Sequence, residues 1–475
     1  MCMAAAVTET IIDKALLEIR NALQDEDIET DPSATAPYAE DKSAFSGDAR
    51  LIAAVLLPET TAEVQSILRV CNTYRIPVTT RGSGTGLVGG AIPVRQGFVL
   101  STERLNTIRK IDPIGMTARV QAGVITDAIS DAASQYGLFY APDPASSAVS
   151  SIGGNIATNA GGLHCVKYGV TRDNVLSLQV VLADGSVIET GKGVIKNVAG
   201  LDLTGLFVGS EGLLGVVTEA TVRLRSIPAE IKTVGAVFSG IQAACSAING
   251  LFEHNVAPAV LELMEVPQLL AAQPKYARFA VEGAMVLVQI DGSDIDSEIE
   301  RVTSLLRDSQ GIIIDARDAQ GDNVDLLNLR KSRPRLPREA IRTHGDVAVP
   351  RSAESTMFGT VIAIARQEGL SYTAIAHAGD GNIHTRFFQI PASEAESSDI
   401  SERVKRAQSR LFEAALAVGG TLTGEHGVGL ELAARLPRQL GEANMKLQRG
   451  IKQVFDPDNI LNPGKWLDAE DGKKD

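Results

Sequence analysis

The sequence is poor in aromatic residues and cysteine and carries no excess of positive charge. Aromatic residues make up 4% of the 475 residues, with one tryptophan, whereas glycine occurs 44 times. The formal net charge of −13 argues against a nucleic acid or an anionic membrane surface as the main partner. The four cysteines form no CxxC pair, which argues against a disulfide framework and an iron–sulfur ligand set. This composition is typical of a compact α/β enzyme.

Two kinds of targeting segment are also missing. No secretory signal opens the sequence, and no apolar run approaches the roughly 18 residues that span a bilayer. We therefore expect a cytoplasmic protein, with peripheral association with a membrane left open.

The first half of the sequence predicts a short N-terminal segment and a β-α-β unit. Residues 1–48 should hold a helix from Thr8 to about Gln24 and an acidic loop, as a separate N-terminal segment. Strands at 51–58 and 76–80 flank a helix that a capping box starts, with Thr60 and Glu63 as its two partners. We expect this domain to cover residues 49–227.

Pro228 marks a domain boundary, after which the order of the predicted elements changes. The order strand, helix, strand, strand, helix, strand predicts a ferredoxin-like arrangement, with strands at 231–238, 259–264, 284–291 and 312–317 and helices at 241–253 and 294–310. Helical stretches at 401–417 and 432–454 follow. We expect this second domain to cover residues 228–467.

A glycine-rich loop follows the strand at 76–80. Gly84, Gly86 and Gly89 satisfy the GxGxxG pattern, but a dinucleotide-binding Rossmann loop must lead directly into a helix. Here the chain continues through Pro93 into an apolar strand. The glycines are therefore expected to bind an anion directly with their backbone N–H groups, unless the loop is only a surface turn.

A second tract, "GGNIATNAGG" at 153–162, has too few side chains to pack well. Such a segment is expected where a large flat ligand lies against bare backbone, with Asn155, Thr158 and Asn159 offering hydrogen bonds. Together with "GSEGLLGVV" at 209–217, the two tracts predict one long cleft, and an extended dinucleotide would fit it.

At this point the sequence resembles a known family. The motifs appear in the order seen in FAD-linked D-2-hydroxyacid dehydrogenases of the vanillyl-alcohol oxidase/p-cresol methylhydroxylase (PCMH) superfamily: "PVTTRGSGTGLVGGAIPV", "PDPASS", "IGGNIATNAGGLHCVKYGVTRDNV", "GLFVGSEGLLGVVTEATV", "HAGDGNIH", "GEHGVG" and "FDPDNILNPGKW". The match covers roughly residues 35–467. It implies an α+β fold with a two-subdomain PCMH-type FAD-binding domain, a cap domain of antiparallel sheet and helices, and a C-terminal segment that returns to FAD.

The resemblance also assigns the cofactor-binding residues. Those carried over are Arg81, Gly82, Ser83, Gly84, Thr85, Gly86, Gly90, Pro142, Gly154, Asn155, Thr158, Asn159, Gly162, Gly212, Val217 and Asn462. Some members of the superfamily bind FAD covalently through His or Cys, and His164 and Cys165 offer such a partner. Non-covalent FAD is favoured.

Two histidines flank the Asp380-Gly381 turn. A two-residue type I′ turn at this dipeptide would place His377 directly opposite His384, with their Cβ atoms about 4.5–5.5 Å apart. Both imidazoles could then bind one divalent metal, with Glu425 as the third ligand. The open alternative is a pair of histidines packed on a half-buried sheet.

The residue types in these motifs suit oxidation of an α-hydroxy acid. His426 is expected to accept the hydroxyl proton as the general base, while the α-hydrogen leaves as hydride to the flavin. A metal, Zn or Mn, would polarise the substrate oxygens. Arg330 matches the family's carboxylate-binding arginine, although Arg333 is close and a surface salt bridge is the alternative. Asn382 is expected to contact the substrate.

The sequence also bears on the substrate and the partners. The family's D-2-hydroxyglutarate branch carries a Thr and a Lys near positions where this sequence has Pro334 and His344, which favours D-lactate or glycolate. The electron acceptor stays open among a quinone, a cytochrome, an electron-transfer flavoprotein and an iron–sulfur subunit, and so does a homodimer. Alternatives are a D-2-hydroxyglutarate dehydrogenase, a metal-independent flavin oxidase that produces H₂O₂, and a non-catalytic flavin-binding subunit.

Overall fold

The capping box predicted near residue 60 starts the helix that covers the first sheet. Thr60 Oγ1 accepts a hydrogen bond from the Glu63 amide at 3.2 Å, and the Glu63 carboxylate accepts one from the Thr60 amide at 3.1 Å. These bonds satisfy two amides that lack partners within helix α3 (Thr61–Tyr74). The face at Val64, Ile67, Leu68 and Cys71 is fully buried.

The computed structural model describes residues 8–280, 283–314, 325–331 and 336–468. The chain forms two compact units. Unit 1 comprises Met1–Gly161, Gly169–Ile227 and Glu425–Asp475, and unit 2 comprises Gly162–Tyr168 and Pro228–Gly424. The expected domains ran from 49 to 227 and from 228 to 467, whereas the chain after Gly424 belongs to unit 1.

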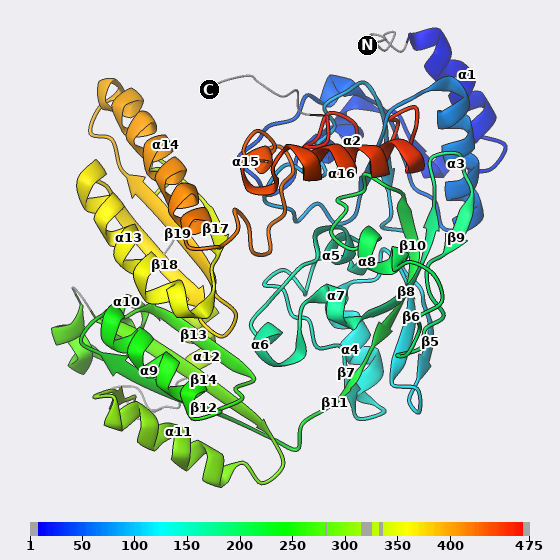
Figure 1. The fold of residues 1–475 in the computed structure, drawn as a ribbon. Helices are drawn as coiled ribbons and strands as arrows, with labels where there is room; N and C mark the ends of the chain where they lie inside the picture. Colours follow the sequence, from blue (N-terminus) through cyan, green and yellow to red (C-terminus); the bar gives the residue numbers. More distant parts are fainter. Residues whose placement is uncertain (1–7, 281–282, 315–324, 332–335, 469–475) are drawn as a thin grey trace. The chain divides into compact units, whose positions relative to one another are not determined.

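Unit 1 contains two main sheets (Figure 1). The first has the order β1-β2-β4-β3, with β1 (Ile28–Glu29), β2 (Ile52–Leu56), β3 (Val78–Arg81) and β4 (Gly97–Ser101). The second has the order β5-β6-β10-β8-β9, with β5 (Ile108–Asp112), β6 (Thr117–Gln121), β8 (Val175–Val181), β9 (Val187–Glu189) and β10 (Val216–Arg223). A small pair, β7 (Leu138–Phe139) and β11 (Arg225–Ser226), lies apart from both.

The helices of unit 1 cover these sheets and connect their strands. Besides α3, they are α1 (Glu9–Ile19), α2 (Pro32–Thr35), α4 (Thr126–Ser134), α5 (Ile152–Thr158), α7 (Thr171–Asn174), α8 (Leu203–Phe207), α15 (Leu436–Leu440) and α16 (Glu442–Phe455). The expected helical tail at 432–454 is therefore two helices, separated at Gly441, where φ is 77°. Helix α1 packs on α3 and shares its apolar core, so the N-terminal segment is part of unit 1.

The C-terminal chain of unit 1 returns to the first sheet. The Val78 amide donates to the Ile460 carbonyl at 2.7 Å, and the Asn462 amide donates to the Val78 carbonyl at 2.7 Å. This pairing places Asn462 beside the start of β3, and its side chain reaches the glycine-rich loop, where Nδ2 donates to the Gly90 carbonyl at 3.0 Å.

Unit 2 is built on one antiparallel sheet. Its order is β15-β12-β14-β13-β18-β19-β16, and β17 also pairs with β19. The strands are β12 (Glu230–Phe238), β13 (Val260–Glu265), β14 (Ala284–Gly292), β15 (Ile312–Ile313), β16 (Ile341–Arg342), β17 (Gly345–Ala348), β18 (Ser371–His377) and β19 (Asn382–Gln389). The sequence β12-α9-β13-β14-α11-β15 is the predicted ferredoxin-like plan, so the α+β fold class is confirmed.

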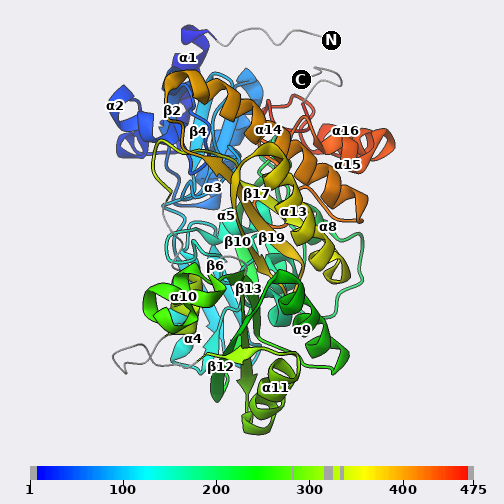
Figure 2. The ribbon, with the colours of Figure 1, turned by 90° about the vertical axis from the view of Figure 1, so that its left-hand side faces the viewer.

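Four helices pack side by side along this sheet. They follow the order α11 (Asp296–Asp308), α9 (Ile241–Glu253), α13 (Glu354–Glu368) and α14 (Glu394–Ala417), and Figure 2 looks onto the row. Helix α14 begins seven residues before the predicted 401. Two short helices, α10 (Pro267–Ala272) and α12 (Leu326–Lys331), contact each other near β13. Among the described residues, no helix combines the length and apolar character needed to cross a bilayer.

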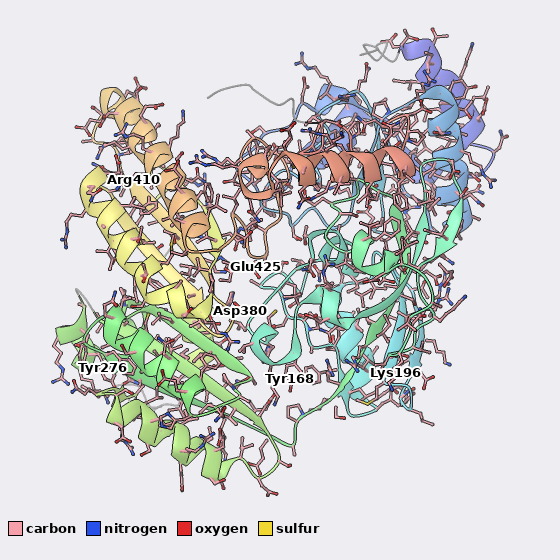
Figure 3. All side chains as sticks on the ribbon, in the orientation of Figure 1. Tyr168, Lys196, Tyr276, Asp380, Arg410 and Glu425 are labelled. Atoms are coloured by element: carbon pink, nitrogen blue, oxygen red, sulfur yellow. The ribbon has the colours of Figure 1, made fainter. Side chains whose placement is uncertain are left out.

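One short piece of the glycine-rich half of the sequence belongs to unit 2. Helix α6 (Cys165–Tyr168) contacts β13. The Tyr168 hydroxyl (Figure 3) donates to Asp291 Oδ2 at 2.6 Å, and Lys167 Nζ donates to the Asp291 backbone carbonyl at 3.0 Å. These bonds fasten the segment to the end of β14.

Candidate active site

The hairpin that carries the two histidines has a different register from the predicted one. His377 pairs with Asn382, and His384 pairs with Ile375, so the loop has four residues and the two histidines are not directly opposite. The prediction of a two-residue turn was wrong because tertiary contacts hold the loop. The Gly379 amide donates to the Leu261 carbonyl at 3.2 Å, and the Gly381 carbonyl accepts from the Val349 amide at 2.9 Å.

The two imidazoles nevertheless meet on one face of the sheet. Diagonal neighbours on adjacent strands are within reach of aromatic side chains. The ring centroids of His377 and His384 lie 5.1 Å apart in an edge-to-face arrangement, and both side chains are buried. Asp380 lies at the tip of the hairpin (Figure 3).

A buried carboxylate from β13 contacts His377. Glu262 is fully buried, and its Oε1 lies 2.7 Å from His377 Nδ1, while its Oε2 accepts a hydrogen bond from Arg330 Nε. Burial alone would raise the pKa of Glu262, but the charges of His377 and Arg330 outweigh it and hold the pKa below its usual value. Since Nδ1 faces Glu262, His377 would bind a metal through Nε2.

A second buried carboxylate lies near His384, at a longer distance. Asp346, on β17, has its Oδ1 3.5 Å from His384 Nδ1. Asp346 also accepts hydrogen bonds from Asn382 Nδ2 at 3.0 Å, Thr423 Oγ1 at 2.7 Å and the Gly424 amide at 3.1 Å. With so many donors on its oxygens, Asp346 is suited to orienting His384 rather than to binding a metal itself.

The segment 421–424 runs beside β17 and delivers the next two residues of the predicted site. Asp346 bridges Thr423, and Ala348 bridges Thr421. A Cβ added at Gly424 would lie 1.7 Å from Asn382 Nδ2, so only glycine fits this approach. Glu425 and His426 directly follow Gly424 in the chain and therefore lie near Asp346.

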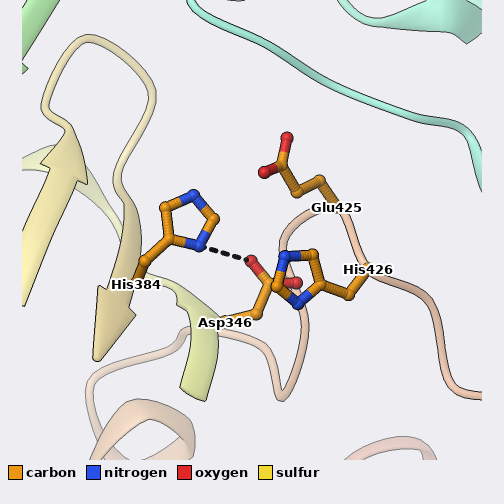
Figure 4. A group of neighbouring side chains, drawn as sticks. All are labelled: Asp346, His384, Glu425 and His426. Carbon is orange, nitrogen blue, oxygen red and sulfur yellow. Dashed lines mark ion pairs between the residues drawn. The ribbon is translucent and has the colours of Figure 1, made fainter. Parts of the chain in front are cut away.

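Four potential ligand groups gather at this point (Figure 4). One ligand atom each from Asp346, His384, Glu425 and His426 lies within 4.8 Å of every other. The predicted metal set was His377, His384 and Glu425. His384 and Glu425 belong to this group, whereas His377 does not and instead contacts it through the ring of His384. The imidazole and carboxylate donors suit a divalent transition metal.

Arg330 and Asn382, the predicted substrate residues, both lie in unit 2 and each has an unpaired polar atom. Arg330 is 4% exposed, its Nε donates to Glu262, and its Nη2 has no hydrogen-bond partner. Asn382 is buried and its Oδ1 has none either. Buried polar atoms without partners are unusual in native proteins and point to a ligand. Arg333 and Pro334 lie outside the described residues, and His344 is exposed.

The glycine-rich loop of unit 1 fits a cofactor. It connects the parallel strands β3 and β4 with no helix between them, as predicted. A Cβ added at Gly86, Gly90 or Gly212 would have no atom closer than 3.7 Å, so the backbone at these glycines is not crowded by neighbouring atoms. Buried oxygens of Asp41, Thr80 and Asn462 lack partners nearby. Open backbone and unpaired polar atoms are what a bound FAD would require.

The remaining loop residues serve different purposes. Arg81 Nη1 donates to the Glu40 carbonyl at 2.6 Å, and burial lowers the Arg81 pKa. Gly82 needs its lack of a side chain, because a Cβ there would lie 2.3 Å from Ser151 Oγ. Gly84 takes a positive φ of 66°, Ser83 is exposed and Thr85 is half-buried.

The second predicted tract is not bare backbone, because residues 152–158 form helix α5, capped by Ser151. Asn155 Nδ2 donates to Thr126 Oγ1 at 2.6 Å, and Thr158 Oγ1 donates to the Gly154 carbonyl at 3.3 Å. Asn159 Oδ1 accepts from the Arg172 amide at 2.8 Å. These side chains therefore hold the local fold. Pro142 is buried, Val217 is half-buried on β10, and Gly162 belongs to unit 2.

His164 and Cys165 both have partners in unit 2. His164 Nε2 lies 3.3 Å from Gln289 Oε1, and Cys165 Sγ accepts a hydrogen bond from the Gly162 amide at 3.0 Å. Neither side chain needs a covalent flavin bond to explain its position.

Sequence reasoning missed Glu262 and Asp346. Each is a charged residue inside an otherwise apolar strand, "VLELM" and "GDVAV", and a charge in such a strand is rarely buried unless it is paired. That signal was present, but the partners lie far away in sequence.

Comparison with known proteins agrees with this picture. Residues 52–191 match the FAD binding domain family, and residues 227–466 match the C-terminal domain of the FAD linked oxidases. The chain is 40% identical over 430 residues to the glycolate oxidase subunit GlcD of Bacillus subtilis, covering 89% of this chain and 90% of that one. It is 34% identical over 419 residues to the D-lactate dehydrogenase of Archaeoglobus fulgidus, covering 86% and 90%.

A solved structure shows the same fold. p-Cresol methylhydroxylase with bound substrate superimposes with a TM-score of 0.77 at 19% identity, over 97% of this chain and 98% of that one. This likeness confirms the predicted PCMH-type fold. Because the family matches span both halves of the chain, the protein belongs to the FAD-linked oxidases and is an FAD-dependent oxidoreductase.

Proposed function

We propose that the protein oxidises a D-2-hydroxy acid, D-lactate or glycolate, to the 2-oxo acid, using non-covalent FAD and a divalent metal, Zn or Mn. The observation that carries the proposal is the pairing of each predicted histidine ligand with a buried carboxylate, Glu262 with His377 and Asp346 with His384. The relatives named glycolate oxidase subunit and D-lactate dehydrogenase support the substrate class.

Carboxylate–histidine pairs are characteristic of metal sites. A carboxylate on one ring nitrogen fixes the tautomer and the ring orientation, so that the other nitrogen can bind a metal. When bound, the metal would supply positive charge to the substrate's hydroxyl and carboxylate oxygens, and FAD would accept a hydride. Glu425 would complete a set of two histidines and one carboxylate, which leaves coordination positions for the substrate.

Three side chains of this chain would act on the substrate. His426 accepts the hydroxyl proton, because a neutral imidazole can serve as a general base. Arg330 donates from Nη2 to the substrate carboxylate. Its Nε side faces Glu262, so a bidentate contact would use the two Nη atoms. Asn382 accepts a hydrogen bond at its unpaired Oδ1.

A panel of substrates tests this assignment. Under anaerobic conditions, D-lactate or glycolate should bleach the flavin absorbance, whereas L-lactate should not. D-2-hydroxyglutarate should bleach it more slowly, since the Thr and Lys of that branch have no counterpart at the exposed His344. Bleaching by simple alcohols or amines, but by none of the hydroxy acids, would replace this function with that of another flavin oxidase.

Metal removal tests the second part of the proposal. Chelation should abolish turnover while FAD stays bound, and Zn²⁺ or Mn²⁺ should restore it. Full activity with H₂O₂ production in a metal-free preparation would establish the metal-independent oxidase instead.

The role of His426 is tested by substitution. His426→Ala should keep both FAD and metal and lose turnover by about 10²–10⁴-fold. Glu425→Gln should instead lose metal affinity, with partial recovery in excess metal. Near-normal turnover of His426→Ala would remove the base assignment.

We further propose that an external acceptor reoxidises the enzyme, either a quinone, a cytochrome, an electron-transfer flavoprotein or an iron–sulfur subunit. Stopped-flow mixing of the reduced protein with a ubiquinone analogue, cytochrome c and ferricyanide would distinguish one- from two-electron acceptors. A rapid reaction with O₂ alone would contradict this proposal.

A further inference from the structure

Glu211 is a buried carboxylate of unit 1 that the proposed chemistry does not use. It lies in the turn between α8 and β10, is 8% exposed and takes a left-handed φ of 52°. Its amide donates to the Ala157 carbonyl at 2.8 Å, and its carbonyl accepts from Asn462 Nδ2 at 2.9 Å. Both ends of its backbone are therefore fixed, and its side chain has a defined direction.

The carboxylate of Glu211 binds the turn that directly follows His426. Oε1 accepts the Val428 amide at 2.7 Å, and Oε2 accepts the Gly429 amide at 2.8 Å. Two successive amides that point at one anion form a backbone nest. The nest needs positive φ at Gly427 (89°) and Gly429 (50°), and a Cβ at Gly427 would lie 2.9 Å from Oε1.

The other side of this turn is fastened to the glycine-rich loop. The Leu430 amide donates to the Val88 carbonyl at 2.8 Å. Lys465 Nζ donates to the carbonyls of Gly89, at 2.8 Å, and Ile92, at 2.5 Å. Asn462 Nδ2 donates to the Gly90 carbonyl at 3.0 Å. Within unit 1, the turn after His426 and the glycine-rich loop assigned to FAD are thus joined by hydrogen bonds.

A carboxylate in this position is costly. Burial raises the pKa of Glu211, against the opposing effect of the amides of Val428 and Gly429 and of Lys465. A buried carboxylate with no full counter-charge destabilises a fold, and a neutral side chain could cap an ordinary turn at lower cost. We therefore infer that the carboxylate serves to fix the position of this turn and not only to stabilise the fold.

We propose that Glu211 is a positioning residue that holds Glu425 and His426 in register with the FAD-binding loop, an inference that rests on the proposed function. Glu211 itself touches neither substrate nor metal. By fixing the two amides that follow His426, it restricts the segment 425–429 to one conformation. General-base transfer and ligand geometry both depend on such placement, and misplacement by about 1 Å can cost about 10²-fold in rate.

Two substitutions and one control test this role. Glu211→Gln keeps the volume but turns an N–H donor toward one of the two amides. Glu211→Gly removes the side chain at a φ that glycine accepts readily, so that folding is not strained. The control Glu219→Gln removes another buried carboxylate of unit 1, which contacts Arg109 and Arg119 instead.

The expected result separates positioning from folding. In both Glu211 variants, FAD content should stay near one per chain, while hydrogen exchange of a peptide spanning 424–431 accelerates. The kcat should fall by about 10–100-fold, the usual effect of removing an outer partner of a site. The KM should change much less. Glu219→Gln should leave exchange at 424–431 and kcat unchanged.

Two outcomes would overturn the inference. One is faster exchange at 424–431 with an unchanged kcat per bound flavin. The other is a lowered melting temperature with no change in exchange or kcat, which would make Glu211 structural. Failure of the proposed function is recognised separately, because His426→Ala would then keep its turnover. If His426→Ala is inactive and the Glu211 variants are fully active, only the positioning role fails.

Discussion

Glu262→Gln removes the charge that lies between Arg330 and His377 without changing the size of the side chain. Glu262 is fully buried and Arg330 is 4% exposed, so water cannot replace the lost partner. Gln would keep one acceptor oxygen, which cannot serve both neighbours. The substitution leaves a buried guanidinium whose Nη2 already has no partner.

The magnitude follows from the burial of the pair. Breaking a buried ion pair by removing one partner costs about 3–5 kcal/mol. With a urea m-value of about 2 kcal/mol per molar, the unfolding midpoint should fall by about 1.5–2.5 M. Loss of the carboxylate that orients His377 should also weaken metal binding by about 10–100-fold.

The assay combines urea unfolding, followed by circular dichroism, with a zinc titration of the metal-free protein. Glu265→Gln is the matched control on the same strand. Burial raises the pKa of Glu265 to about 7, although a hydrogen bond with the backbone of Ala374 acts to lower this pKa. The neutral Gln should therefore be tolerated there. An unchanged midpoint in Glu262→Gln would refute the buried-pair reasoning, and a lowered midpoint with unchanged zinc affinity would refute the orienting role.

Three further predictions concern pH, FAD and its attachment. Burial raises the pKa of Glu354 to about 8, and the negative charges of Asp380 and Glu262 contribute to this rise. Between about pH 4.5 and 8, the native state therefore holds a proton that the unfolded state releases. The free energy of unfolding should then fall as pH rises through this range, by up to about 1.4 kcal/mol per pH unit. The urea midpoint, measured from pH 5 to 8, should fall less steeply in Glu354→Gln than in the unchanged protein. An equal slope of urea midpoint against pH in both proteins would contradict this. Gly86→Val should lower FAD affinity in a fluorescence titration without lowering the melting temperature of the apoprotein, because the nearest atom to the added Cβ is Asp41 Oδ2 at 3.7 Å, an ordinary contact. Normal FAD binding would place the cofactor elsewhere. Acid precipitation should leave the flavin in the supernatant, and flavin in the pellet would point to a covalent bond at His164 or Cys165.

Local signals in the sequence were sufficient for most of the fold. The capping box at Thr60 and Glu63 is visible in four residues, and the Asp184-Gly185 dipeptide, a common turn sequence, joins β8 and β9. The ferredoxin-like order follows from periodicity alone. Each of these features depends on neighbours in the chain, which is why pattern reasoning found them.

The features that were missed depend on distant partners. The hairpin loop at 378–381 takes its length from bonds to Leu261 and Val349, which a turn rule based on Asp380-Gly381 cannot include. Glu262 is 115 residues from His377, so no motif joins them. The family motifs supplied Arg330, Glu425 and His426, but the carboxylates that orient the histidines became visible only with the fold.

The chain passes between the two units four times, after Gly161, Tyr168, Ile227 and Gly424. No single cut in the gene could therefore separate a complete flavin module from a complete cap module. A fragment that stops at Ile227 would lack Asn462 and Lys465, and one that spans Pro228 to Gly424 would lack α6. Exchange of substrate domains between relatives by recombination would have to transfer residues 162–168 together with 228–424, and chimeras that move only the longer piece should lose the bonds of Lys167 and Tyr168 to Asp291.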